Sequence, residues 1–345
     1  MSSRCVAVYG AAGHTGRFVA GELARRGLQP VLIGRDAPAA GGGVGPWRTA
    51  SCDEPGELDL ALAGADAVIN CAGPFADTAP SIVEAALRCG IHYLDVAAEQ
   101  RVVRQTLATY DTGARECGVV VMPAVAFYGG LADLLATMVT HGAGRVESIR
   151  IGVALDYWHP TPGTRRTGAR NTARRLVVAD GRLAPAPVAA SPGEWLFPEP
   201  FGRQPVATVP LSEVITINRH LPARSVSSFM TLAPLEDLGN PATPPPVAAD
   251  DTGRSSQKFL MDVIAATECG TRRACASGRD IYAVTAPMVV EACQRILLRP
   301  PATGGTFVAG ELFDASDFLA ALAPEVNVRG VDPDSSQFRI AASVG

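Results

Sequence analysis

The chain has 345 residues, of which 47% are hydrophobic, and a formal net charge of −4 at pH 7. This length predicts two domains or one large one, and the apolar content excludes a globally disordered chain. Because no overall basic field is present, nucleic acid is not expected as a partner.

The N-terminus and the cysteines predict a soluble, reduced, cytoplasmic protein. Residues 1–4 lead directly into an apolar run of strand length, without the apolar region and cleavage site of a signal peptide. The eight cysteines show no CxxC spacing, so neither a disulfide framework nor a metal site is expected. Residues 118–140 carry one charge, but Pro123 and the Gly129–Gly130 pair would interrupt a membrane helix, so no membrane partner is expected.

The first 130 residues alternate apolar, strand-like runs with segments of helical periodicity. This alternation predicts βαβ units, and hence an α/β fold with a doubly wound parallel sheet of the Rossmann type. Residues 37–53 are expected to form a loop and a short edge element. The expected strands cover 5–10, 31–34, 66–71, 91–96 and 119–123, and the expected helices cover 15–26, 81–89 and 100–117.

The pattern changes after residue 130. We expect a helix over 131–140, strands over 146–157, 206–219 and 224–235, and a helix over 168–178, which together predict an α+β domain over residues 131–284 for substrate binding and dimerisation. Residues 240–254 are Pro-rich and polar, and are expected to form an exposed mobile loop. A helix over 285–299 and the tail after it are expected to return to the NAD(P)-binding domain of residues 1–130.

A glycine-rich segment lies between the first strand and the first helix. In Rossmann domains such glycines permit a tight turn, the approach of a pyrophosphate and close helix packing, and the helix N-terminus faces the phosphates. The position at the first βα turn favours dinucleotide binding over a plain glycine-rich loop. The residues predicted to bind the cofactor here are Gly10, Ala12, Gly13, His14, Thr15 and Gly16.

The end of the second strand distinguishes between the two nicotinamide dinucleotides. Gly34-Arg35-Asp36 places an arginine at the strand tip, and a guanidinium can hold a 2′-phosphate with two hydrogen bonds. Asp36 follows one residue later, where it can cap the next turn. We therefore expect NADP(H) rather than NAD(H).

Two further strand ends contribute to the expected cleft. Residues 66–75 end in Cys71, Ala72, Gly73 and Pro74, small groups that allow the backbone to lie against the cofactor at the switch point of the sheet. Residues 92–99 bring His92, Tyr93, Asp95 and Glu99 to the same edge. A single titratable residue at a strand end is usually structural, but this density predicts a cleft wall.

These segments together resemble the saccharopine dehydrogenase-like NAD(P)-binding family. The resemblance rests on residues 6–17, 32–36, 68–75 and 92–99, with patchier matches at 162–164 and 278–286. It implies a Rossmann domain, an α+β substrate domain, a homodimer, and a substrate site that includes Glu99 and Thr164. Ala97–Ala98 and residues 124–130 depart from the family pattern near the expected cleft, so the substrate is not carried over.

The first functional hypothesis is an NADP(H)-dependent oxidoreductase acting on the C=N bond of a small amino-acid-like substrate, as the resemblance implies. Tyr128, Tyr93 and His159 are the candidate proton donors, and Arg165 is the candidate carboxylate clamp. Each of the three proton-donor candidates is individually more often structural, and a solvated turn explains Arg165 equally well. A Tyr-x-x-x-Lys dehydrogenase is excluded because Arg254 stands four residues before Lys258, the one lysine of the chain.

Two alternatives remain open. The first is an enoyl (C=C) reductase acting on a carrier-bound or CoA-bound intermediate, because Arg166, Arg170 and Arg174 would form a basic stripe on the helix expected over 168–178, suited to an acidic carrier protein. An exposed helix face without a partner explains the same stripe. The second is a non-catalytic, NADP-binding redox sensor, since a fold does not dictate a function.

Overall fold

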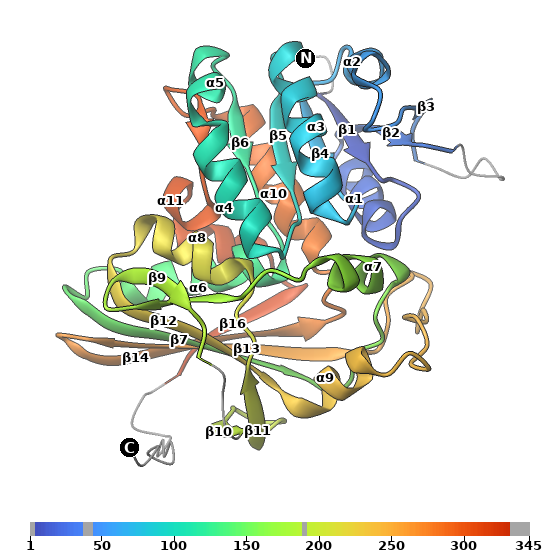
Figure 1. The fold of residues 1–345 in the computed structure, drawn as a ribbon. Coiled ribbons are helices and arrows are strands. Elements are labelled where there is room, and N and C mark those ends of the chain that lie inside the picture. Colours follow the sequence, from blue (N-terminus) through green and yellow to red (C-terminus); the bar gives the residue numbers. More distant parts are fainter. Residues whose placement is uncertain (1–3, 37–43, 188–191, 332–345) are drawn as a thin grey trace.

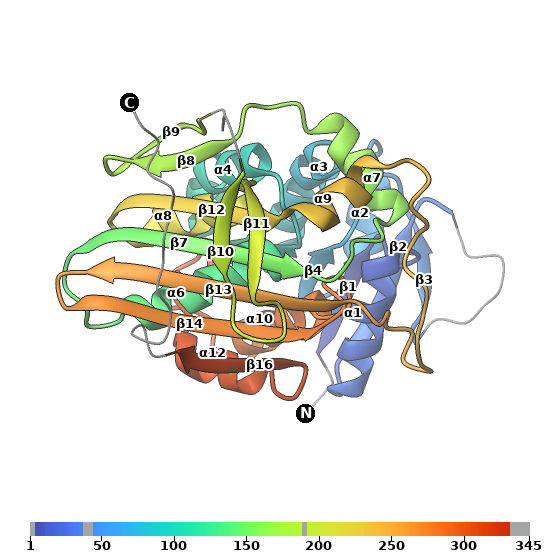
Figure 2. The ribbon, with the colours of Figure 1, turned by 90° about the horizontal axis from the view of Figure 1, so that it is seen from below.

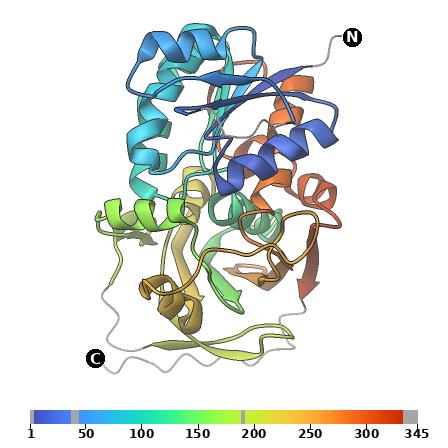
Figure 3. The same ribbon diagram turned by 90° about the vertical axis from the view of Figure 1, so that its right-hand side faces the viewer.

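The structure, a computed structural model, describes residues 4–36, 44–187 and 192–331. Residues 37–43 of the expected 37–53 loop lie outside the described residues. Two layers of sheet lie one above the other, with helices around the first sheet and between the two (Figure 1). Figure 3 shows the same arrangement after a quarter turn about the vertical axis.

The first sheet is entirely parallel and has the order of a Rossmann fold, with one short strand added at its edge. Its strands, in order across the sheet, are β15 (Gly305–Thr306), β6 (Val120–Met122), β5 (His92–Asp95), β4 (Ala67–Asn70), β1 (Cys5–Tyr9), β2 (Gln29–Gly34) and β3 (Trp47–Thr49). The predicted α/β fold class is confirmed.

Alternate residues of these strands face opposite layers of helices. Val6 and Val8 of β1 belong to one buried cluster together with α1, whereas Ala7 and Tyr9 belong to another together with α2 and α3. Both faces of the sheet are therefore covered, as the continuous apolar runs predicted. The helices are α1 (His14–Arg25), α2 (Pro55–Leu62), α3 (Phe75–Cys89), α4 (Gln100–Thr109), α5 (Asp111–Glu116) and α10 (Thr285–Leu298).

The second sheet is mixed and much wider (Figure 2). A hairpin crosses its outer face, where Trp195 packs on Ala154 and Leu260. The strands of the second sheet, in order, are β10 (Gly193–Leu196), β11 (Arg203–Thr208), β12 (Ala223–Thr231), β7 (Val146–Leu155), β13 (Lys258–Thr267), β14 (Gly270–Arg279) and β16 (Val326–Val331), and β10 and β11 form the hairpin. In addition, β8 (Leu176–Ala179) pairs with β12, and β9 (Arg182–Pro185) pairs with β8.

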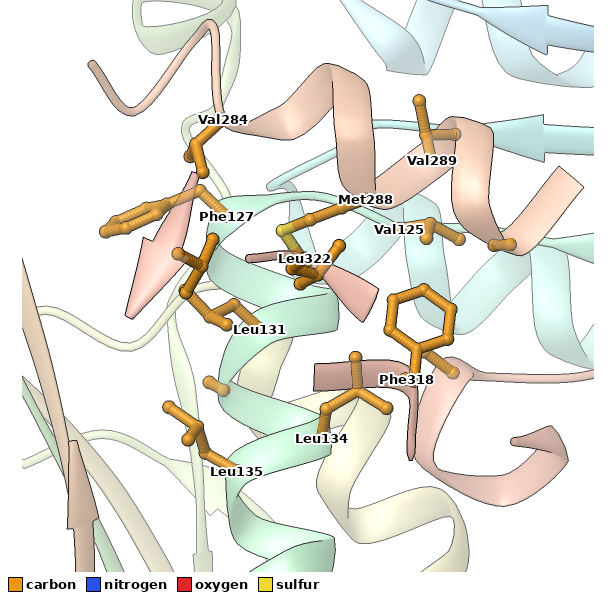
Figure 4. Packing of buried hydrophobic residues seen from close by; sticks show 14 of the residues in the cluster. Val125, Phe127, Leu131, Leu134, Leu135, Val284, Met288, Val289, Phe318 and Leu322 are labelled. Atoms are coloured by element: carbon orange, nitrogen blue, oxygen red, sulfur yellow. The ribbon is translucent and has the colours of Figure 1, made fainter. Parts of the chain in front are cut away.

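Helices join the two sheets into one packed body. In Figure 4, Phe127 and Leu131, at the start of the segment that becomes α6, lie near Met288 of α10, while Phe318 of α12 closes the same core. The remaining helices are η1 (Phe127–Leu131, a π-helical turn), α6 (Ala132–Thr140), α7 (Pro162–Arg170), α8 (Ser212–His220), α9 (Leu232–Gly239), α11 (Ala309–Leu312) and α12 (Ala315–Ala321). No described helix has the length and apolar character needed to cross a bilayer.

Several expected elements of the second half differ from the structure. The expected strands over 206–219 and 224–235 each become a strand followed by a helix, β11 with α8 and β12 with α9. The expected 168–178 helix is also wrong: α7 ends at Arg170, and β8 begins at Leu176. The segment after α10 divides between the sheets, since β15 joins the first and β16 the second.

Candidate active site

The glycine-rich loop closes as tightly as its sequence predicts. Gly10 has a φ of +80°, in the left-handed region that favours glycine. A Cβ added to Gly16 would lie 2.2 Å from the carbonyl oxygen of Gly10, so no side chain fits there. Gly10 in turn lies against Ala72, whose Cβ would be 2.9 Å from an added Cβ. The turn after β1 and the turn after β4 are thus in contact.

The N-terminus of α1 is open toward solvent in the way an anion requires. No side chain caps this helix, and Ala12 and Gly13 are exposed just before it. Arg35 and Asp36 are exposed at the end of β2, and Arg35 makes no ion pair with another described residue. Free N–H groups and an unpaired guanidinium fit the pyrophosphate and 2′-phosphate of a dinucleotide.

A buried amide shapes the turn after β4. The Asn70 side chain accepts a hydrogen bond from the Ala72 N–H at 3.0 Å and donates one to the Thr78 hydroxyl at 3.1 Å. Burial raises the pKa of the Cys71 thiol above its ordinary value, so the thiol stays protonated. The sequence interpretation missed the role of Asn70, although its position at the strand end was visible.

A buried carboxyl group joins the ends of β5 and β6. Asp95 accepts hydrogen bonds from the N–H groups of Ala97 (2.9 Å) and Ala124 (2.8 Å), and from the Tyr93 hydroxyl (2.9 Å). Ala124 has a φ of +60°, which costs energy for a residue other than glycine. Asp95 therefore holds in place the strained turn that leads to Tyr128.

A cavity of about 520 Å³ opens where the first sheet meets the second half of the chain. It brings together seven of the predicted site residues. These are Thr15, Cys71, Gly73, Glu99, Tyr128, Thr164 and Arg165. The rest of the lining is mostly apolar, and comprises Phe75, Val96, Ala98, Ala126, Phe127, Trp158, Thr161, Gly163, Thr167, Gly168, Ala169, Asn171, Arg175, Val209, Leu211, Leu235, Leu238, Ile281, Tyr282 and Thr285.

Two of the three candidate proton donors lie away from this cavity. Tyr93 is completely buried within the first sheet, and its hydroxyl is engaged with Asp95. The His159 ring stacks at a tilt on Tyr157, with 4.5 Å between the ring centroids, and does not line the cavity. We therefore do not retain Tyr93 or His159 as proton donors.

Tyr128 is placed differently. It lines the cavity, yet its hydroxyl oxygen is buried and has no hydrogen-bond partner among the described residues. Burial raises its pKa well above the ordinary value, so the hydroxyl keeps its proton at neutral pH. A buried hydroxyl without a partner costs about 1–3 kcal/mol.

Tyr282 organises the opposite wall of the cavity, and the sequence interpretation gave it no role. Its hydroxyl accepts a hydrogen bond from Trp158 Nε1 at 2.8 Å and lies 3.0 Å from the Thr164 hydroxyl. Its ring also meets the edge of His14, with the centroids 5.4 Å apart. Tyr282 thus connects the nucleotide loop to the cavity. The 278–286 match to the family was the available signal.

The predicted carboxylate clamp is already occupied. Arg165 donates hydrogen bonds to the carbonyl oxygens of Asn240 (3.0 Å), Thr243 (2.9 Å) and Leu238 (3.4 Å). These contacts hold the Pro-rich segment after α9 beside the cavity. Arg165 therefore lines the site while binding backbone, which argues against its predicted role as a clamp.

The carboxyl group of Glu99 is held at the cavity wall by backbone groups. It accepts hydrogen bonds from the N–H groups of Phe75 and Ala98, both at 3.1 Å. Burial raises its pKa, and these hydrogen bonds oppose that effect. Glu99 thus fixes the start of α3 beside the turn after β4.

The expected basic stripe does not form. Because α7 ends at Arg170, Arg174 lies beyond the helix and cannot continue a face with Arg166. Arg170 pairs with Asp77 at 2.7 Å. The physical reason is the short helix, since a stripe at intervals of four residues needs an unbroken one.

Comparison with known proteins identifies the class. Residues 6–122 match the family model described as saccharopine dehydrogenase NADP binding domain. This match covers about a third of the chain, so residues 6–122 are similar to the NADP-binding domain of that family. The predicted resemblance to this family and the NADP-binding type are confirmed for these residues, and the assignment to an oxidoreductase class agrees with them.

The fold has a counterpart that covers nearly the whole chain. Saccharopine dehydrogenase (L-Glu forming) from Saccharomyces cerevisiae aligns with a TM-score of 0.66 over 96% of this chain and 100% of that one. The sequence identity is 13%, so this likeness concerns the fold alone.

Two curated relatives match in sequence. Both carry the name "Putative trans-acting enoyl reductase" and come from two strains of Mycobacterium tuberculosis. Each is 28% identical over 149 residues, which cover 40% of this chain. The matched region spans 36%, about a third, of the relatives' own length.

Proposed function

We propose that this chain is an NADP(H)-dependent oxidoreductase that reduces a C=C bond conjugated to a carbonyl group. The observation that carries the proposal is Tyr128, which lines a mostly apolar cavity that begins at the nucleotide-binding turns and whose buried hydroxyl has no hydrogen-bond partner among the described residues. A cavity with such a group also favours an enzyme over a redox sensor.

The character of the cavity favours C=C over C=N as the reacting bond. An amino-acid-like substrate carries a carboxylate that needs a cationic partner, and the predicted one, Arg165, binds backbone carbonyl groups instead. Arg175, the other arginine of the lining, donates a hydrogen bond to the Pro210 carbonyl oxygen at 3.1 Å and also borders the smaller pocket beside the cavity. The lining is mostly apolar, which suits an acyl chain. The names of the two curated relatives point to the same reaction.

When bound, NADPH supplies a hydride from its nicotinamide ring. Addition of that hydride to the β-carbon leaves the negative charge on the substrate as an enolate, and the α-carbon must then receive a proton. Tyr128 holds such a proton, because its raised pKa keeps the hydroxyl protonated. The apolar walls exclude water and so favour delivery from this group.

The test is NADPH oxidation by the purified chain with an α,β-unsaturated acyl thioester of N-acetylcysteamine, and separately with a cyclic imine. We expect turnover with the thioester. Replacing Tyr128→Phe should lower kcat by about 10²–10⁴-fold, the usual contribution of a positioned acid, without changing NADPH affinity.

Tyr157→Phe is the matched control, because the Tyr157 hydroxyl pairs with Ser256 at 2.9 Å and does not line the cavity. If only the imine is reduced, the reacting bond is C=N and not the proposed C=C. Full activity of Tyr128→Phe would remove the proton-donor role. Absence of NADPH binding would contradict the proposal as a whole.

A further inference from the structure

A second, smaller pocket of about 140 Å³ adjoins the cavity. Asn171, Arg175 and Leu211 line both, so the two spaces are neighbours along one wall. The pocket is therefore directly beside the cavity in which the reacting end of a ligand would lie.

The walls of the smaller pocket are strongly cationic. Arg101 and Arg104 come from the first turns of α4, and Arg174 and Arg175 come from the segment before β8. No acidic residue is among the described residues that line the pocket. Arg101, Arg104 and Arg174 are exposed and form no ion pair with another described residue.

The pocket is held together by a buried side chain. Gln100, at the start of α4, donates to the carbonyl oxygens of Leu176 (2.8 Å) and Leu211 (2.9 Å) and accepts from the Leu176 N–H (2.7 Å). Three segments distant in sequence are thereby fixed around the arginines. The N-terminus of α4 adds its positive dipole end to the same place.

The cofactor does not account for these charges. Arg35 follows β2, whereas α4 follows β5, and β1 and β4 lie between those strands in the sheet. The 2′-phosphate and the arginine pocket are therefore on opposite sides of the switch point. An anion in the pocket would belong to the substrate.

We infer that the pocket formed by Arg101, Arg104, Arg174 and Arg175 binds the phosphate of a 4′-phosphopantetheine arm whose acyl thioester enters the cavity. Arginine is the side chain best suited to phosphate, because its planar donors engage two oxygens at once. The inference rests on the proposed function, since it names the carrier of the unsaturated acyl group. The arm belongs either to coenzyme A or to a carrier protein.

The experiment is calorimetric titration of the full chain, saturated with NADP⁺, with 4′-phosphopantetheine, with pantetheine and with coenzyme A. We expect the phosphorylated arm to bind at least about tenfold more tightly than pantetheine, since hydrogen bonds to charged groups have that weight. Replacing both Arg101→Ala and Arg104→Ala should abolish this preference and leave pantetheine binding unchanged.

Arg166→Ala is the matched control, an exposed arginine of α7 that lines neither pocket. Equal binding of pantetheine and its phosphate, or an unchanged preference in the double variant, would overturn the inference. If coenzyme A binds much more tightly than 4′-phosphopantetheine alone, the natural ligand is coenzyme A. If the two bind equally, the arm belongs to a carrier protein. A titration with NADPH distinguishes failure of this inference from failure of the proposed function, because NADPH binding does not depend on these arginines.

Discussion

Arg35 is exposed at the end of β2 and free of ion pairs with the described residues, so its guanidinium is available to a 2′-phosphate. Arg35→Ala should weaken NADPH binding by about 10–100-fold, the weight of one or two charge-assisted hydrogen bonds, and leave NADH binding unchanged. Nicotinamide fluorescence during titration measures both affinities.

Arg25→Ala serves as the control for that substitution. Arg25 lies in the last turn of α1 and pairs with Glu22 at 2.6 Å, far from the N-terminus of the helix. It should leave both affinities as they are. An equal loss of NADPH and NADH affinity in Arg35→Ala would show that Arg35 does not read the 2′-phosphate.

Two tyrosines show how a single hydrogen bond separates a structural residue from a functional candidate. Burial raises the pKa of both Tyr93 and Tyr128. The Tyr93 hydroxyl has Asp95 as its acceptor, whereas the Tyr128 hydroxyl has no partner among the described residues. Asp95 follows Tyr93 by two residues on β5, so this pairing could be inferred from the sequence, whereas the surroundings of the Tyr128 hydroxyl could not.

At the scale of elements, the helix dipole and burial have opposite effects on the pKa of Glu213 in the first turn of α8. Glu213 accepts a hydrogen bond from the Leu211 N–H at 2.8 Å, and its position near the helix N-terminus favours the anion. Burial nevertheless dominates and raises its pKa. Its contribution to stability is therefore full below its unfolded pKa of about 4.3 and is lost as pH rises through the folded pKa.

Glu213→Gln removes this titration. The variant should gain stability relative to the parent chain as pH increases from about 4.5 to 8, because only the parent must ionise a buried carboxyl group. Denaturant unfolding at several pH values measures the difference.

Glu22→Gln is the opposite case and the control. Burial raises the pKa of Glu22, but hydrogen bonds from Arg25 and Arg26 outweigh it and lower the pKa overall. Its stability contribution is fully present above the unfolded pKa of about 4.3 and is lost as pH falls through the folded pKa, so the variant should lose stability relative to the parent as pH rises through that acidic range, with little further change above it. The same sign for both variants would contradict this assignment.

The difference between α8 and its predicted strand has a physical cause. Val214, Ile215, Thr216 and Ile217 are β-branched and favour a strand locally. All four are buried in the helix, and Thr216 donates to the Gly129 carbonyl oxygen at 3.1 Å. Tertiary packing therefore overrides propensity. Five strands of the first sheet, β1, β2, β4, β5 and β6, were predictable because each is a short apolar run next to helical segments. The two-residue strand β15 was not predicted, since so short a segment carries no such pattern.

The residues of the candidate site likewise divide into those that the sequence predicts and those that it does not. The glycine loop and Arg35 are local signals at one βα turn and the next strand end, so the sequence sufficed to predict them. Tyr282, and the arginine pocket that Arg101 and Arg174 share, are assembled from segments far apart in the chain. Arg165 was predicted to bind a carboxylate, but its carbonyl partners lie after α9. The sequence around Arg165 does not show that contact.

At the scale of the whole molecule, the two sheets share one hydrophobic core. Val8 of β1, Ile151 of β7 and Met288 of α10 belong to the same buried cluster. A cavity that lies between the sheets depends on that continuity, because its walls come from both. We therefore expect the chain to unfold as one cooperative unit.

Phe318, fully buried in α12, packs within this shared core and tests that expectation. Phe318→Ala should reduce the free energy of unfolding by about 3–5 kcal/mol, whereas Leu60→Ala, on the exposed side of α2, should change it by less than about 0.5 kcal/mol. In a Trp47→Phe background, tryptophan fluorescence follows Trp158 and Trp195, which lie after residue 130, while far-UV circular dichroism follows the helices, of which the three longest, α1, α3 and α10, lie against the first sheet. We expect the two signals to report the same unfolding transition, and Phe318→Ala to shift that transition equally in both. Separate transitions would show that the sheets unfold independently, so that the cavity between them can open without loss of the nucleotide-binding half.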